Sequence, residues 1–176
     1  GFATWCHFCE YMKDSVYVQK EVGEFVNQHF VPIRMDMEKE GKELNRRLMA
    51  SSYPQLVFFD GNGEIVHRVA GQKSAFTFLQ LCNDALDPAK QYRTYEQKFK
   101  NGTATQAEVG AFFKMMNSAA IDAQPTFSKY FMGLPDSIFL TGSSFRLFND
   151  YMRDVEQPAM KRFLINRAVF SHLTSA

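Results

Sequence analysis

Trp5-Cys6-His7-Phe8-Cys9 places two cysteines, separated by two residues, directly before a run with helical spacing. At the first turn of such a helix, Cys6 lies at the N-terminus with its sulfur partly exposed, and Cys9 lies one turn further in. This spacing lets Cys9 close a disulfide with Cys6. The N-terminal end of a helix carries about half a positive charge and free N–H groups, which favour a thiolate at Cys6. We therefore expect a reactive Cys6 with a lowered pKa, and a Cys9 that resolves the mixed disulfide.

A Cys-x-x-Cys pair has two other uses, as zinc ligands or as a structural disulfide. Zinc requires four ligands, only two cysteines lie together here, and His7 points to another part of the helix. A distant residue such as His29 or His67 would have to complete the set. A disulfide that spans two residues cross-links little chain, so its entropic benefit is small. The redox interpretation is favoured, and it predicts no metal and no cofactor beyond the redox-active disulfide.

The composition excludes several classes of protein. The chain has 176 residues, 45% of them hydrophobic, with 18 phenylalanines, which is enough for one domain or two small ones with a real core. The net charge is +1 and no basic block is present, so no nucleic-acid partner is expected. No apolar run approaches the roughly 18–20 residues of a membrane span. The third cysteine, Cys82, lies in an apolar helical run and is expected to be a buried small hydrophobe.

The first half of the chain alternates between helical and strand patterns. We expect helices over residues 6–13, 18–29, 39–49 and 74–86, and strands over residues 30–37, 55–60 and 64–70. Gly61-Asn62-Gly63 predicts a hairpin turn between the last two strands. Residues 1–4 are too short to form a strand with its own turn, although the pattern places them immediately before the cysteines.

After Asp87-Pro88 the strand signals vanish, and these residues are the expected boundary between two domains, residues 1–87 and 88–176. The second half predicts about five short helices rich in aromatic residues. Thr105 to Glu108 is a capping box that opens one of them. Pro125 and Pro158 are typical of helix starts.

Residues 1–87 resemble the thioredoxin family. The resemblance rests on Trp-Cys-x-x-Cys, on Tyr53-Pro54 before a strand, and on a Phe-Asp-Gly-Asn-Gly-Glu hairpin that ends in Val69-Ala70-Gly71. It is strongest to bacterial thioredoxin-like proteins that carry an extra helical region. It implies an α/β, thioredoxin-like fold, with the first strand largely missing from this chain, followed by an all-α helical domain.

The resemblance also implies roles for residues around the cysteines. Pro54 would be a cis-proline beside them, leaving the backbone of Tyr53 free to pair with an extended substrate, and Trp5 would form a wall of the active site. His7 and Phe8 replace the family's Gly-Pro pair at positions that tune the redox potential. A protonated His7 would lower the pKa of the first cysteine, unless it is simply solvent-exposed. Phe8 is either a substrate contact or surface packing.

The predicted function is thiol–disulfide exchange with protein substrates and a redox partner protein, catalysed by Cys6 and Cys9. The resemblance implies a bacterial protein in a periplasmic or otherwise extracytoplasmic setting. It also implies a buried acid that assists the resolving thiol, on the strand that is missing here. The alternative is a non-enzymatic thioredoxin scaffold whose helical half docks a partner. The intact pair of thiols favours the enzyme, because a pure scaffold needs neither.

Overall fold

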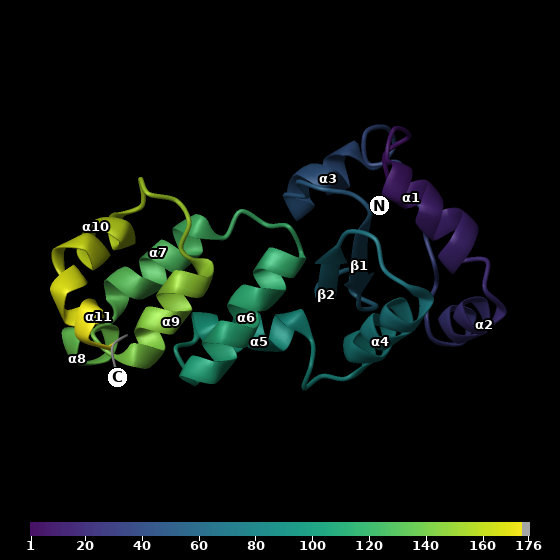
Figure 1. The fold of residues 1–176 in the computed structure, drawn as a ribbon. Helices are drawn as coiled ribbons and strands as arrows, with labels where there is room; N and C mark the ends of the chain where they lie inside the picture. Colours follow the sequence, from purple (N-terminus) through teal and green to yellow (C-terminus); the bar gives the residue numbers. More distant parts are fainter. Residues whose placement is uncertain (174–176) are drawn as a thin grey trace. The chain divides into compact units, whose positions relative to one another are not determined.

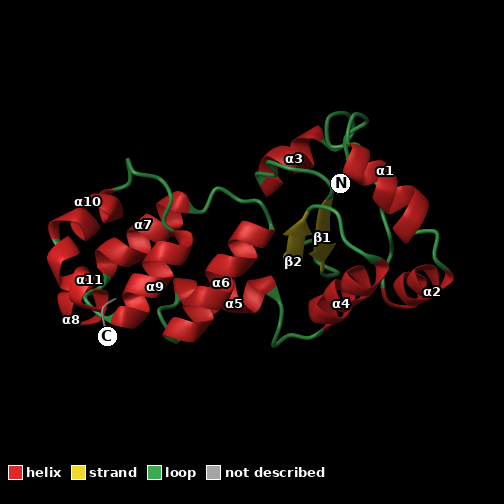
Figure 2. Cartoon of the chain, viewed as in Figure 1, coloured by secondary structure: helices red, strands yellow, loops and turns green. Residues whose placement is uncertain are grey.

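The structure, a computed structural model, describes residues 1–173. It divides into two compact units, Gly1–Ile121 and the residues from Asp122 onward, which are described separately (Figure 1). Helices dominate both units, and the strands belong to the first (Figure 2).

The first unit is built around an antiparallel hairpin. Its elements are α1 (His7–Tyr11), the π-helix η1 (Met12–Val16), α2 (Lys20–His29), α3 (Lys42–Leu48), β1 (Gln55–Phe59), β2 (Ile65–Ala70), α4 (Ala75–Leu86), α5 (Tyr92–Lys100) and α6 (Gln106–Ser118). β1 pairs with β2 so that Leu56 faces Val69. Gly63 takes a φ of 78° in the connecting turn, a conformation that glycine adopts without steric cost. The predicted hairpin is therefore confirmed.

Three local predictions about helices have clear outcomes. Ser74, the first residue of the helix expected over residues 74–86, caps α4 by accepting the N–H of Thr77. The capping box of Thr105 and Glu108 opens α6, as predicted. The first helical segment was expected to end at residue 13, but it runs further. It continues directly into η1 and ends at Val16.

The strand predicted over residues 30–37 does not form. A single parallel bridge joins Phe2 to Asp36, with Phe2 N donating to the Met35 carbonyl at 3.0 Å. On its other side Gly1 pairs with Gln55, whose N–H donates to the Gly1 carbonyl at 2.9 Å. Alternating apolar and polar residues form a strand only if a second strand pairs with them along their length. Here the segment that pairs with residues 30–37 is too short to form a ladder of hydrogen bonds.

One face of the hairpin carries the main apolar core. Leu56 and Val69 pack there against side chains from η1, α2 and α4, namely Met12, Val16, Val22, Phe78 and Cys82. Cys82 is a free, buried thiol, as predicted, and burial raises its pKa to about 11.

The opposite face carries polar side chains and is covered by helices from later in the chain. Because successive side chains of a strand alternate, Gln55 and Arg68 lie on this face. Gln55 Nε2 donates to the Ala119 carbonyl at the end of α6, at 3.2 Å, and Arg68 donates to the Leu48 carbonyl at 2.6 Å. α5 and α6 both contact β2 (Figure 1). These contacts extend the first compact unit to Ile121, past residue 87. Whether residues 1–87 fold on their own, as the expected domain boundary implies, stays a prediction.

The second unit is a bundle of short helices with an aromatic core. Its described helices are α7 (Gln124–Gly133), α8 (Asp136–Phe139), α9 (Gly142–Tyr151), α10 (Pro158–Ile165) and α11 (Arg167–Leu173). Pro125 and Pro158 lie in the first turns of α7 and α10, as predicted. Phe163 stacks on Phe148, with ring centroids 4.6 Å apart, and on Phe170 at 5.0 Å. From α5 onward the described residues form seven helices, where about five were predicted.

Candidate functional site

Cys6 and Cys9 form a disulfide at the start of α1, with their Cα atoms 5.2 Å apart. Cys6 is the N-cap of the helix, and its sulfur accepts the backbone N–H of Cys9 at 3.2 Å. The pairing and its place at a helix N-terminus follow from the two-residue spacing, because that spacing puts the second sulfur one turn above the first. The structure therefore brings together the two predicted thiols, while their separate chemical roles stay predictions.

The disulfide is more buried than expected. Cys6 is 4% exposed and Cys9 is 3% exposed, whereas the sequence predicted a partly exposed Cys6. The reason is local packing: Ala3 lies against both cysteines, and Phe2 and Tyr53 pack on the same cluster. In this disulfide form both cysteines are therefore shielded from solvent by the residues that surround them.

Trp5 stands beside the disulfide, 69% exposed, and is held by two other residues. Its indole N–H lies 3.0 Å from each carboxylate oxygen of Glu38. Its ring meets the ring of Tyr53 edge-on, with centroids 5.9 Å apart. Sequence reasoning predicted Trp5 as a wall but missed Glu38, because residues 36–43 hold several carboxylates and no local signal distinguishes one of them.

The Tyr53–Pro54 peptide bond is cis, as the resemblance implied. The Tyr53 hydroxyl accepts a hydrogen bond from Asn45 Nδ2 at 2.8 Å, and burial raises the pKa of this phenol. The Pro54 carbonyl accepts the N–H of Gly71 at 2.8 Å, which ties this segment to the loop after β2. Asn45, on α3, was also missed by sequence reasoning, because a contact between a helix and a following loop leaves no periodic signal.

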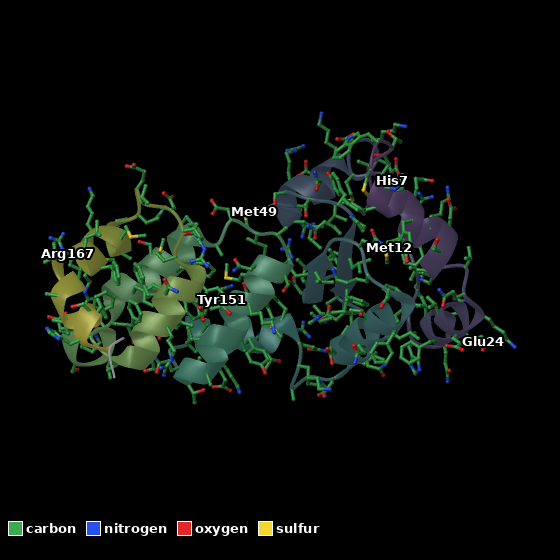
Figure 3. The ribbon with its side chains drawn as sticks, in the orientation of Figure 1. His7, Met12, Glu24, Met49, Tyr151 and Arg167 are labelled. Atoms are coloured by element: carbon green, nitrogen blue, oxygen red, sulfur yellow. A yellow bond between two sulfur atoms is a disulfide. The ribbon has the colours of Figure 1, made fainter. Side chains whose placement is uncertain are left out.

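His7 and Phe8, the residues between the cysteines, are both exposed, and His7 lies on the outer side of α1 (Figure 3). Their rings lie 6.2 Å apart. Both side chains therefore face solvent and neither belongs to the cluster that buries the cysteines. Their predicted tuning and contact roles are compatible with this position.

Lys73 is a cation in the loop between β2 and α4 that the sequence did not single out. Its ammonium donates to the carbonyls of Ala70 and Gly71, at 2.6 and 3.1 Å. Its backbone N–H donates to the sulfur of Met12, one turn beyond Cys9, at 3.3 Å. Burial lowers the pKa of Lys73, and among residues 1–173 no carboxylate forms a salt bridge with it.

The described residues offer no obvious alternative centre. Within residues 1–173, no group of three or more histidine, cysteine or acidic side chains could hold a metal ion. His67, considered as a distant zinc ligand, is buried, and its Nδ1 accepts the N–H of Tyr92 at 3.1 Å. No helix in the described part of the chain is both long enough and apolar enough to cross a membrane.

Comparisons with known proteins agree with this geometry. A family model described as a thioredoxin-like domain matches residues 2–86. Thioredoxin Y, chloroplastic, of Oryza sativa subsp. japonica is 33% identical over 89 residues, which cover 51% of this chain and 50% of that protein. The chain thus spans about half the length of this curated relative. No solved structure gives a significant match.

Proposed function

Because the chain belongs, through residues 2–86, to the thioredoxin-like family, we propose that it is a thiol–disulfide oxidoreductase that acts on protein substrates. The observation that carries the proposal is the Cys6–Cys9 disulfide at the N-terminus of α1. The packing of Tyr53 on the cysteine cluster, with the Trp5 ring against Tyr53, supports the same conclusion.

The proposed reaction is a balanced exchange of two electrons. In the reduced chain, the Cys6 thiolate attacks one sulfur of a substrate disulfide, a mixed disulfide forms, and the other substrate sulfur leaves as a thiolate. Cys9 then loses its proton to solvent and attacks the Cys6 sulfur. The Cys6–Cys9 bond forms, the mixed disulfide breaks, and the two substrate thiolates take up protons. The reverse sequence oxidises a substrate dithiol.

The surroundings of the pair support the assignment of Cys6 as the nucleophile. The N–H of Cys9 points at the Cys6 sulfur, and a donor to the charged form of a group favours that form. The same donor cannot serve Cys9 itself. Substrate contacts are proposed for Phe8 and for the backbone of Tyr53, and a tuning role for His7. A redox partner protein and a setting outside the bacterial cytoplasm also remain proposals, and the rice relative is chloroplastic.

Insulin-disulfide reduction by the purified full chain, with dithiothreitol as electron donor, tests the proposal. We expect Cys6→Ser to abolish the acceleration, Cys9→Ser to accumulate mixed disulfides, and the matched control Cys82→Ser to leave the rate unchanged. Equilibration with glutathione then gives the favoured direction of electron flow. A wild-type chain that neither reduces insulin nor oxidises a peptide dithiol would favour the alternative, a thioredoxin scaffold that binds a partner without exchange.

A further inference from the structure

We infer that the second unit docks an acidic, amphipathic segment of a partner protein on the corner where α10 ends and α11 begins. This corner consists of Lys161, Leu164, Ile165, Arg167 and Val169. The inference goes beyond the proposed exchange reaction, because it concerns the helical unit that follows the redox domain.

The corner exposes apolar side chains that the core does not need. Ile165 is 83% exposed, and Leu164 and Val169 are exposed as well. Phe163, just before Leu164, and Phe170, just after Val169, stack with ring centroids 5.0 Å apart and belong to the aromatic core of the unit. Exposed apolar side chains are ordinary when scattered, whereas several on adjacent helices are typical of an interaction surface.

The charges at this corner have one sign and are unpaired. Lys161 lies three and four residues before Leu164 and Ile165, so the three share one face of α10. No salt bridge in the described part of the chain involves Lys161 or Arg167, and Arg167 lies at the outer edge of its helix (Figure 3). From Gln157 to Leu173 the sequence contains no acidic residue.

The neighbouring Arg162, by contrast, spends its charge on contacts within the unit. It bonds Asp136 and the Phe131 carbonyl, each at 2.5 Å, and its guanidinium lies 4.1 Å from the centroid of the Phe139 ring. Arg162 therefore holds α7, α8 and α10 together. Lys161 and Arg167 have no such task, so their charge is available to a partner.

A protein segment fits this corner better than a membrane or a nucleic acid. Juxtamembrane clusters that bind anionic lipid typically hold about four to eight cations, and this corner offers two. The break at Asn166 between two short helices also prevents one continuous face of the kind that lies flat on a bilayer. Leucine-type anchors at helical spacing with carboxylates beside them would meet both the apolar side chains and the cations. Stable interfaces use roughly 20–30 residues a side, so a surface built on these few side chains fits a weak, transient contact.

The test measures fluorescence anisotropy with the full chain and two labelled probes. Each probe is an amphipathic peptide of about 16 residues with leucine on one face, carrying glutamate on the other face in one probe and lysine in the second. We expect the glutamate peptide to bind at least about tenfold more tightly than the lysine peptide. Lys161→Glu with Arg167→Glu, and separately Leu164→Ser with Ile165→Ser, should each weaken it about tenfold.

Val155 supplies the matched control, because it is 67% exposed on the same unit but stands between Asp154 and Glu156. Val155→Ser should leave glutamate-peptide binding unchanged. Equal binding of the two peptides, insensitivity to both corner variants, or loss with Val155→Ser would overturn the inference. So would binding to vesicles containing phosphatidylglycerol without binding to the glutamate peptide. Should the serine variant fail to fold by circular dichroism, the charge-reversed variant alone decides.

Discussion

Trp5 is the only tryptophan of the chain, and its orientation depends on Glu38. The carboxylate accepts the indole N–H on both oxygens, while the Tyr53 ring supports the indole from the side. This arrangement keeps an exposed aromatic ring beside a buried disulfide. Because a disulfide quenches a nearby indole, we expect the emission of Trp5 to report the redox state of the pair.

We expect Glu38→Ala to release the indole and to shrink the change in Trp5 emission on reduction. Glu38→Gln keeps a carbonyl acceptor and should retain most of the signal. The contact is exposed, so the loss in stability should stay below about 1 kcal/mol. Emission spectra before and after dithiothreitol measure the effect. Glu43→Ala, which removes an acid that pairs with Arg46 on α3, is the control, and an equal effect there would contradict this role for Glu38.

The three cysteines should differ sharply in reactivity. In the disulfide form the Cys9 N–H points at the Cys6 sulfur, at the N-terminus of α1, and thiols in such positions are the more reactive ones, so we expect Cys6 to be the most reactive thiol of the reduced chain. Burial raises the pKa of Cys82 to about 11. At pH 7 iodoacetamide should therefore label Cys6 first and leave Cys82 unlabelled until the chain is denatured, as read by peptide mass spectrometry. Faster labelling of Cys9 or Cys82 would reverse the assignment.

Among the helices and strands, the sequence predicted those features that residues close together in the chain determine. Helices that begin with Ser74, Thr105 and Pro158 were recognisable because caps and first-turn prolines act within a few residues. The strand over residues 30–37 was predicted wrongly. An alternating pattern shows that one side of a segment can be buried, but it does not show that a neighbouring strand is present to pair with it. The contacts of Glu38 and Asn45 were invisible for a related reason: they join segments whose proximity only the folded chain creates.

His67 joins β2 to α5 and should make stability depend on pH. Its Nδ1 accepts the Tyr92 N–H, and burial lowers its pKa, so the folded state holds the neutral ring. The unfolded chain takes up the proton at about pH 6.5, earlier than the folded chain does. Stability is therefore complete above about pH 6.5 and declines as the pH falls below it.

Urea unfolding at about pH 7.5 and pH 5.5 checks this dependence. The wild-type chain should lose stability between the two values, and His67→Gln, which keeps a neutral side chain, should remove the part of the loss due to His67. His29→Gln serves as the control, because the ring of His29 lies at the end of α2 and is exposed. A pH dependence unchanged by His67→Gln would show that other groups produce it.

At the scale of the whole molecule, the family match and the compact unit end at different residues. The match stops at residue 86, but the first unit continues to Ile121. The difference has a physical cause, since the hairpin face that carries Gln55 and Arg68 is covered by α5 and α6. Periodicity predicted these helices but not the surface on which they pack, so the sequence placed them with the later helices.

A chain that ends at residue 121 should therefore fold and exchange thiols like the full chain, whereas one that ends at residue 87 should not. The shorter form uncovers Val66 and Ala70 and leaves Gln55 without its acceptor at Ala119. Returning Val66 to water costs about 1.5–3 kcal/mol, and a buried amide without its partner costs about 1–3 kcal/mol more, so the combined loss reaches the lower part of the 5–15 kcal/mol that stabilises a typical domain. Circular dichroism, urea unfolding and insulin reduction compare the three chains. If residues 1–87 unfold at the same urea concentration and react at the same rate as residues 1–121, the later helices are not part of the redox unit, and the boundary belongs at Asp87-Pro88 as the sequence alone predicts.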